Sequence, residues 1–200
     1  MLDSEVCIIV ATYGDDPKWD ALANRAVEST HGQGAKVLRI HGDTLASARN
    51  EAAQYANSNW LIFLDADDEL SPGYVVAMLK AGEGDIRKPS TLGVVNGKED
   101  DYPVMIPKRN LRAANHIVIG AMVRCDLFRA VGGFRELSAL EDWDLFQRMV
   151  LAGGVVTEVC DAVYRVHVNG DGRNSNTAAH RSAYIEVRNF NREAWLKYDK

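Results

Sequence analysis

The sequence contains Trp60-Leu61-Ile62-Phe63-Leu64-Asp65-Ala66-Asp67-Asp68, a short apolar run that ends abruptly in three carboxylates. Such a run is typical of a strand that is buried on both faces inside a parallel sheet. The strand would deliver the residues after it to the carboxyl edge of the sheet, where open α/β folds bind ligands. Carboxylates crowded there repel one another, so the cluster needs a cation or several hydrogen-bond donors nearby. A solvated acidic turn is the alternative.

The first third of the chain alternates apolar strand segments with amphipathic helix segments. Strands are predicted at 6–11, 36–40 and 60–64, and helices from about Pro17 and over about 45–56. Strands that alternate with helices pair in parallel through right-handed crossovers. The pattern therefore predicts an α/β fold with a mostly parallel central sheet flanked by helices.

The second half of the chain has a less regular pattern. Glycines and prolines punctuate 81–115, which predicts loops and short strands with a small antiparallel extension such as Pro103–Pro107. Beyond that segment we expect strands at His116–Val123, Val155–Val159 and Ala162–Val168, and helices at Asp126–Val131, from about Glu141 and from about Thr177.

Composition narrows the class of protein. The 200 residues are 46% hydrophobic and 26% charged, as in soluble globular proteins. A net charge of -5 argues against a nucleic-acid partner, because phosphate recognition normally needs a basic excess. No segment approaches the roughly 20 apolar residues of a transmembrane helix. With three scattered cysteines and an acidic amino terminus, we expect a cytoplasmic protein.

Some metal and phosphate motifs nearly fit the acidic cluster. An EF-hand loop from Asp65 would need glycine at Leu70 and glutamate at Val76. A phosphatase that forms an aspartyl-phosphate also places Asp-x-Asp after a strand, but a small hydroxyl residue normally follows where Glu69 stands. Hard carboxylate oxygens suit Mg²⁺ or Mn²⁺, which bridge protein carboxylates and the phosphates of a nucleotide. Diphosphate chemistry fits the cluster best.

Short segments along nearly the whole chain occur in an order that resembles one enzyme family. They are Ile8–Tyr13, Ala48–Ala53, Phe63–Asp68, Val131–Phe134, Glu141–Leu145 and Tyr164–His167. Together they resemble the glycosyltransferases of the GT-A fold, specifically the family 2 type. The resemblance implies a single GT-A domain, with a nucleotide-binding half at about 1–70, an acceptor half with the catalytic elements at about 71–176, and a C-terminal helix at 177–200.

The resemblance implies which residues bind the donor and the metal. The nucleotide and its sugar would be bound by Ala11, Thr12, Tyr13, Asp43, Arg49, Asp65, Ala66 and Arg173. Asp67 and His167 would hold Mn²⁺ or Mg²⁺, while Asp68 would support the site or cap the next helix. Asp43 departs from the family pattern, which has a double Asp followed by Gly-Ser at this point, so the identity of the base stays open.

The resemblance also assigns the acceptor side. Asp142 would be the base that takes the proton from the acceptor hydroxyl, with Glu141, Trp143 and Gly133 around the sugar and acceptor pocket. The alternative for Asp142 is an ordinary acidic residue at a helix N-terminus, stabilised by the helix dipole.

The implied activity is metal-assisted transfer of a single sugar from a nucleotide-diphosphate donor, expected to be a UDP-sugar, to an acceptor hydroxyl with inversion. The chain has no Gln-x-x-Arg-Trp run, which favours single-sugar transfer over polymerisation. The alternatives are another metal-dependent phosphoryl or nucleotidyl transferase and a catalytically silent module that binds a nucleotide or glycan. The sequence leaves the acceptor unknown.

Overall fold

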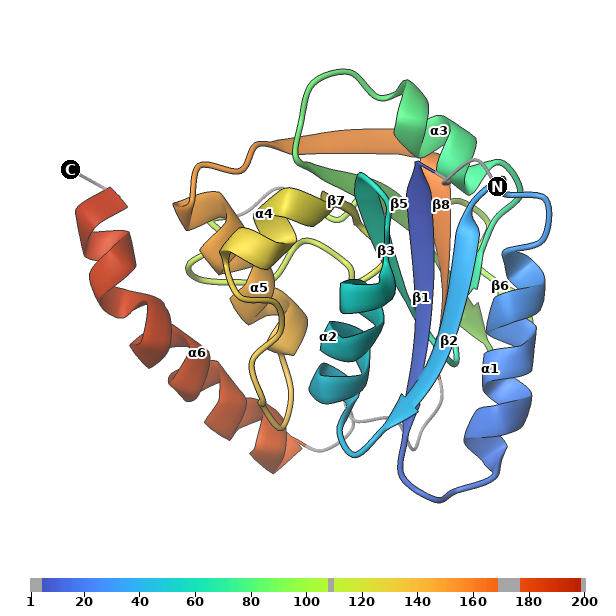
Figure 1. The fold of residues 1–200 in the computed structure, drawn as a ribbon, viewed down its shortest axis with the longest axis horizontal. Helices are drawn as coiled ribbons and strands as arrows, with labels where there is room; N and C mark the ends of the chain where they lie inside the picture. Colours follow the sequence, from blue (N-terminus) through green and yellow to red (C-terminus); the bar gives the residue numbers. More distant parts are fainter. Residues whose placement is uncertain (1–4, 108–109, 169–176, 199–200) are drawn as a thin grey trace.

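The computed structural model describes residues 5–107, 110–168 and 177–198. In chain order the elements are β1 (Val6–Tyr13), α1 (Lys18–Ser29), β2 (Lys36–Gly42), α2 (Leu45–Tyr55), β3 (Trp60–Asp65), β4 (Glu69–Leu70), α3 (Tyr74–Lys80), β5 (Ile86–Val95), β6 (Lys98–Glu99), β7 (Met122–Arg124), α4 (Cys125–Ala130), α5 (Glu141–Leu151), β8 (Val156–Val168) and α6 (Thr177–Tyr198). Figure 1 shows α6 at the opposite end of the molecule from α1. None of the described helices combines the length and apolar character of a bilayer span.

The strands form one eight-stranded sheet in the order β2-β1-β3-β7-β5-β8-β4, with β6 beside β5. β1 is parallel to β2 and β3, and β5 is parallel to β8. Because β7 is antiparallel to both β3 and β5, those two strands run in the same direction. The long strands are therefore all parallel and only the short β4, β6 and β7 oppose them, which confirms the predicted mostly parallel sheet.

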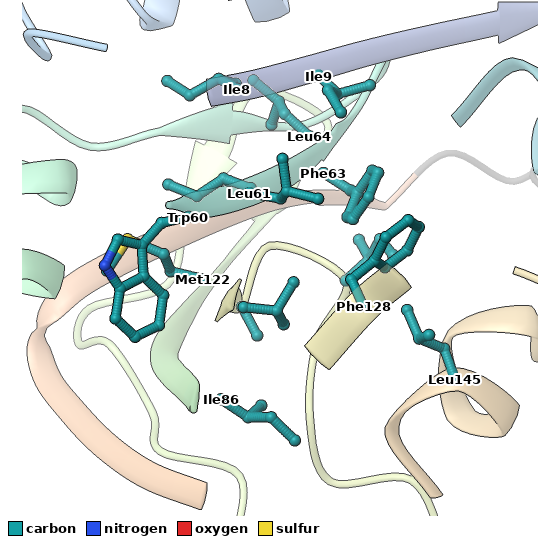
Figure 2. Close-up of a cluster of buried hydrophobic side chains, with 14 of the residues drawn as sticks. Ile8, Ile9, Trp60, Leu61, Phe63, Leu64, Ile86, Met122, Phe128 and Leu145 are labelled. Atoms are coloured by element: carbon teal, nitrogen blue, oxygen red, sulfur yellow. The ribbon is translucent and has the colours of Figure 1, made fainter. Parts of the chain in front are cut away.

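The core is built around β3, whose apolar residues are buried on both faces of the sheet. The Phe63 ring lies 5.1 Å from that of Phe128 and 4.8 Å edge-on from that of Phe134, measured between centroids. Figure 2 shows Phe63 beside Phe128, which comes from α4. Edge-to-face rings of this kind contribute more than their buried area alone. The triangle of rings fixes α4 and the turn after it against the end of β3.

A buried carboxylate joins α5 to α6. Asp144 is fully buried and accepts hydrogen bonds from Arg135, Arg148 and Asn191 at 2.8–3.0 Å. A buried charge is tolerated only when donors surround it in this way. Arg148 also donates to the carbonyl oxygen of Gly133, so the same network holds the glycine turn.

The strand predicted at His116–Val123 is wrong over most of its length, because β7 contains only Met122–Arg124. The preceding residues form a loop that packs on β8. Gly120 lies against Tyr164 so closely that a Cβ atom would be 2.1 Å from the ring. Its carbonyl oxygen accepts a hydrogen bond from Tyr74. The apolar residues of this loop are therefore buried by packing rather than by strand pairing.

Two further strand predictions need correction. The expected pair Val155–Val159 and Ala162–Val168 is one strand, β8, which absorbs a bulge where its register with β5 shifts between Pro89 and Ser90. The segment expected to hold only loops and short strands contains the ten-residue β5. At Pro103–Pro107 the pairing is limited to one antiparallel bridge between Val104 and Thr91. Proline within β5 coincides with the bulge, where an irregular ladder tolerates a missing donor.

The ring triangle predicts a large loss of stability when one ring is removed. Phe128→Ala should lower the free energy of unfolding by about 3–5 kcal/mol, because it leaves a cavity between β3 and α4. Phe190→Ala, at a ring that is 53% exposed on α6, should cost less than about 1 kcal/mol. Urea unfolding measures both, and equal losses would contradict this account of the core.

Candidate active site

A cavity of about 290 Å³ opens beside the carboxyl end of β3. Segments far apart in the sequence meet at its walls, which contain Arg49, Asp65, Asp68, Asn115, Val118, Ile119, Ala139, Leu140, Glu141, Asp142, Val166 and His180. The structure thus brings together four of the residues predicted for the site, from α2, β3 and α5. It also adds α6 through His180, which sequence reasoning did not include.

Arg49 connects the donor-side strand to the helix that carries the expected base. Its guanidinium donates to Asp65 at the end of β3 and, over 2.8 Å, to Glu141 at the start of α5. The side chain is 2% exposed and lies over the Phe134 ring at 5.0 Å. Two carboxylates therefore share one buried guanidinium, in the charge-assisted geometry that arginine favours. Glu141 faces Arg49 at the cavity wall, and its expected contact with an acceptor stays a prediction.

The acidic cluster at the end of β3 has the chemistry of a divalent cation site. Oxygen atoms of Asp65, Asp67 and Asp68 lie within 4.8 Å of one another. Burial, together with the charges of the other two, raises the pKa of Asp68 well above its usual range. Asp68 nevertheless accepts hydrogen bonds from the Tyr164 hydroxyl and from the backbone N–H of His167. Hard oxygen ligands with excess negative charge fit Mg²⁺ or Mn²⁺.

His167 lies beside the cluster without belonging to the carboxylate trio. Its Nε2 atom is 3.5 Å from Glu69 Oε2, and no hydrogen bond to that nitrogen is formed within the described residues. The backbone of His167 holds Asp68, as described above. Ligation of a metal by its imidazole stays a prediction, and so does ligation by Asp67.

Asp142 is half-buried at the cavity wall and is held by two donors. The Asn115 side-chain amide donates to Oδ2 over 2.9 Å, and the backbone N–H of Trp143 donates to Oδ1 over 2.7 Å. Burial is the main cause that raises the pKa of Asp142 from 3.8 to about 7, with the Glu141 charge second. A carboxylate with a pKa near neutrality suits a general base.

The backbone just before α5 determines where Asp142 lies. Leu140, which precedes the helix and lines the cavity, has a φ of 61°. A non-glycine residue in this left-handed region costs about 1–3 kcal/mol, so the turn is maintained by its surroundings. It places the first two residues of α5 at the cavity wall.

Two residues predicted for the acceptor pocket do not line this cavity. Trp143 is 1% exposed, donates from Nε1 to the carbonyl oxygen of Leu111 and stacks on Tyr184, so in this structure it is a packing residue. Gly133 packs against α2, where a Cβ atom would be 2.4 Å from Asn50 Oδ1. Neither residue lines the cavity. Their contacts with the sugar or acceptor, which the family resemblance implies, stay predictions.

The residues predicted for the nucleotide lie at the ends of β1, β2 and β3. Thr12 lines a second hollow of about 610 Å³ together with His41, to which its hydroxyl is 3.1 Å distant. Tyr13 is half-buried, Asp43 is exposed after β2, and Ala11 and Ala66 are buried. Arg173 lies outside the described residues. The nucleotide contacts of these residues stay predictions.

Sequence reasoning missed three residues that the fold places at the cavity or under it. Tyr164 is fully buried and bonds Asp68, while its hydroxyl also accepts from the backbone N–H of Asp65. Asn115 orients Asp142, and His180 reaches the wall from α6. Tyr164 belongs to the segment Tyr164–His167 that resembles the family, but neither its role nor that of Asn115 could be read from the sequence, because their partners are distant in sequence.

Comparisons with known proteins identify the family of the chain and the fold that it shares with solved structures. Residues 4–113, more than half of the chain, match the family model for glycosyl transferase family 2. No curated protein sequence matches the chain significantly. The fold is similar to that of S. aureus TarS 1–349 in complex with UDP-GlcNAc, with a TM-score of 0.60 and 15% identity, over 86% of this chain and 61% of that chain.

A second solved structure is similar over more of the chain. The mannosyltransferase PcManGT from Pyrobaculum calidifontis, in complex with GDP-Man and Mn²⁺, has a TM-score of 0.62 and 12% identity, over 92% of this chain and 62% of that chain. The chain spans less than two thirds of either structure, and at these identities the likeness shows the fold.

The raised pKa of Asp142 predicts a pH-dependent stability. The unfolded carboxyl group releases its proton near pH 4, whereas the folded one keeps it to about pH 7, so stability falls as the pH rises between these values. The amide of Asp142→Asn does not titrate, so this variant does not lose stability in that way. Its free energy of unfolding, relative to that of the unchanged protein, should therefore increase from pH 4 to 7 and level off above pH 8.

Urea unfolding across that range measures the difference. Asp126→Asn is the matched control, because Arg124 lowers the pKa of this exposed carboxylate in the first turn of α4. Its stability relative to the unchanged protein should be constant between pH 5 and 8. A flat profile for both variants would show that Asp142 has an ordinary pKa.

Proposed function

The chain belongs to glycosyl transferase family 2, and we propose that it transfers a single sugar from a nucleotide-diphosphate donor to an acceptor hydroxyl with inversion. One observation carries the proposal: a single cavity joins the acidic cluster after β3 to Asp142, a separate carboxylate whose pKa is about 7. Transfer needs these two parts, a site for the donor diphosphate and a base for the acceptor. A module that only binds a ligand has no need of the second.

The donor is proposed to be a UDP-sugar, with its nucleoside at the carboxyl ends of β1 and β2. Ligands bind at this edge in open α/β sheets, and Thr12 already lines a hollow there. The similar TarS structure contains UDP-GlcNAc, and the mannosyltransferase structure contains GDP-Man. Asp43, exposed after β2, is the candidate for reading the base. We place the nucleotide on residues 1–70 and the acceptor on 71–176.

The acidic cluster is proposed to hold Mn²⁺ or Mg²⁺ through Asp67, with Asp65 and Asp68 beside it. A divalent ion there would neutralise the charge that develops on the leaving diphosphate. Tyr164 supports this arrangement from beneath, because its hydroxyl fixes Asp68 and the backbone of Asp65. The mannosyltransferase structure contains Mn²⁺.

Asp142 is proposed to accept the proton of the acceptor hydroxyl. As that oxygen forms a bond to the anomeric carbon, the bond from this carbon to the diphosphate breaks on the opposite face, and the proton goes to Asp142. Asn115 and the N–H of Trp143 orient the carboxylate for this step. The pKa of about 7 lets the group be ionised before the reaction and still be basic enough to accept the proton.

The donor proposal predicts metal-dependent binding of UDP. With UDP at about 100 times its dissociation constant and Mn²⁺ or Mg²⁺ present, the melting temperature should rise by roughly 5 °C or more. EDTA should abolish this rise in melting temperature. The same measurement with GDP tests whether the donor nucleotide contains guanine instead of uracil. Asp67→Asn should weaken metal-dependent binding about tenfold or more, whereas Asp161→Asn, at an exposed carboxylate of β8, should leave it unchanged. If no nucleoside diphosphate stabilises the protein, the transferase proposal fails.

The base proposal predicts that Asp142→Asn loses transfer and keeps donor binding. General base catalysis contributes about 10²–10⁴-fold, so kcat should fall by that factor while the affinity for UDP stays the same. Asp126→Asn, which removes an acid from the first turn of another helix, should leave kcat intact. Nucleotide release on supplying candidate acceptors measures the rate. Unimpaired transfer by Asp142→Asn would remove this residue from the mechanism.

A further inference from the structure

A third cavity, of about 430 Å³ and called here the arginine cavity, lies between α5, α6 and the segment before Asn115. Its walls contain Arg112, Gln147, Tyr184, Arg188, Arg192 and Trp195. None of the residues that line it also lines the candidate active site. Tyr184 stacks on the buried Trp143 with ring centroids 5.2 Å apart, and its hydroxyl donates to the carbonyl oxygen of Ala113.

A buried hydrogen-bond donor at this cavity lacks a partner. The Gln147 side chain is fully buried, and its Oε1 accepts a hydrogen bond from Trp195 Nε1 over 2.6 Å. Since an indole nitrogen can only donate, this bond fixes the orientation of the amide. Gln147 Nε2 is left buried with no hydrogen-bond partner among the described residues. An unmade bond of this kind costs about 1–3 kcal/mol, so a ligand that accepts from it is favoured.

The cavity is strongly positive. Three guanidinium groups line it, from Arg112, Arg188 and Arg192, and no Asp or Glu is among the described residues of its walls. Arg188 and Arg192 are four residues apart on α6, where like charges repel one another. Arg188 lies near Tyr184, 3.3 Å from its hydroxyl oxygen. An anion would relieve this repulsion and satisfy the Gln147 amide at the same time.

We propose that this cavity binds the phosphate group of a small organic phosphate. Guanidinium forks match phosphate oxygens in pairs, and a phosphate dianion offers more charge and more acceptors than a carboxylate. The volume lies in the range of small-molecule sites and exceeds the need of an isolated ion. The ring of Tyr184 and the side chain of Ile185 supply an apolar wall for the organic part.

Isothermal titration calorimetry in chloride buffer with EDTA tests the proposal. The probes are sn-glycerol 3-phosphate, inorganic phosphate and, as the uncharged control, glycerol. Saturable binding of glycerol 3-phosphate that is tighter than that of inorganic phosphate supports the proposal, and added UDP should not displace it. If only inorganic phosphate binds, the proposal that the ligand is an organic phosphate is wrong. If neither phosphate binds, the cavity is not a phosphate site.

Matched variants locate the binding. Arg188→Gln with Arg192→Gln should weaken it at least tenfold, because two charge-assisted contacts are lost. Arg181→Gln removes the same charge from an exposed position of α6 that does not line the cavity, and should leave the affinity unchanged. Equal affinities for the double variant and this control would overturn the proposal.

Gln147→Glu gives an independent measurement. The new carboxylate can still accept from Trp195, but it places negative charge among the three arginines where the ligand would bind. Phosphate binding should be abolished, and a cooperative thermal transition without ligand would show that the variant is folded. Retained phosphate binding in this variant would place the ligand elsewhere.

Discussion

The arrangement of the site depends on the buried guanidinium of Arg49. It joins Asp65, where the donor-side strand ends, to Glu141, where the helix of the proposed base begins, and Phe134 covers it. A buried cation is expensive unless its donors have partners, so displacing either carboxylate would leave part of the buried guanidinium without a hydrogen-bond acceptor. The spacing between the acidic cluster and Asp142 is therefore set by an electrostatic requirement of the core, and does not need a ligand to establish it.

The parts of this fold that could be predicted are those in which local pattern and tertiary role agree. The apolar run of β3 is buried on both faces, and its acidic exit meets Asp142 in one cavity, as the motif order implied. Family membership and the mostly parallel sheet followed from the same segments. Helix α6 was predicted from the spacing of its apolar residues, but its contribution to the site through His180 was not.

The rest depends on contacts between distant segments, which leave no periodic signal. The apolar run at His116–Val123 suggested a strand, yet most of the chain there is buried as a loop, in which Gly120 packs on Tyr164. Trp143 follows the proposed base in sequence, but successive residues of a helix point in different directions, so it packs into the core. Asp68 was expected to be secondary, and its bonds to Tyr164 and the His167 backbone make it the most buried member of the cluster.

Helix α6 lines the candidate active site and the arginine cavity, and it also takes part in the hydrogen bonds to Asp144. His180 lines the candidate active site, Arg188 and Arg192 line the arginine cavity, and Asn191 bonds the buried Asp144 of α5. These residues belong to one continuous helix, so a shift of α6 on occupation of one cavity also changes the walls of the other. Thermodynamic linkage makes such an effect reciprocal: each ligand changes the affinity for the other by the same factor. The C-terminal helix is thereby the element that can couple ligand binding at the two cavities.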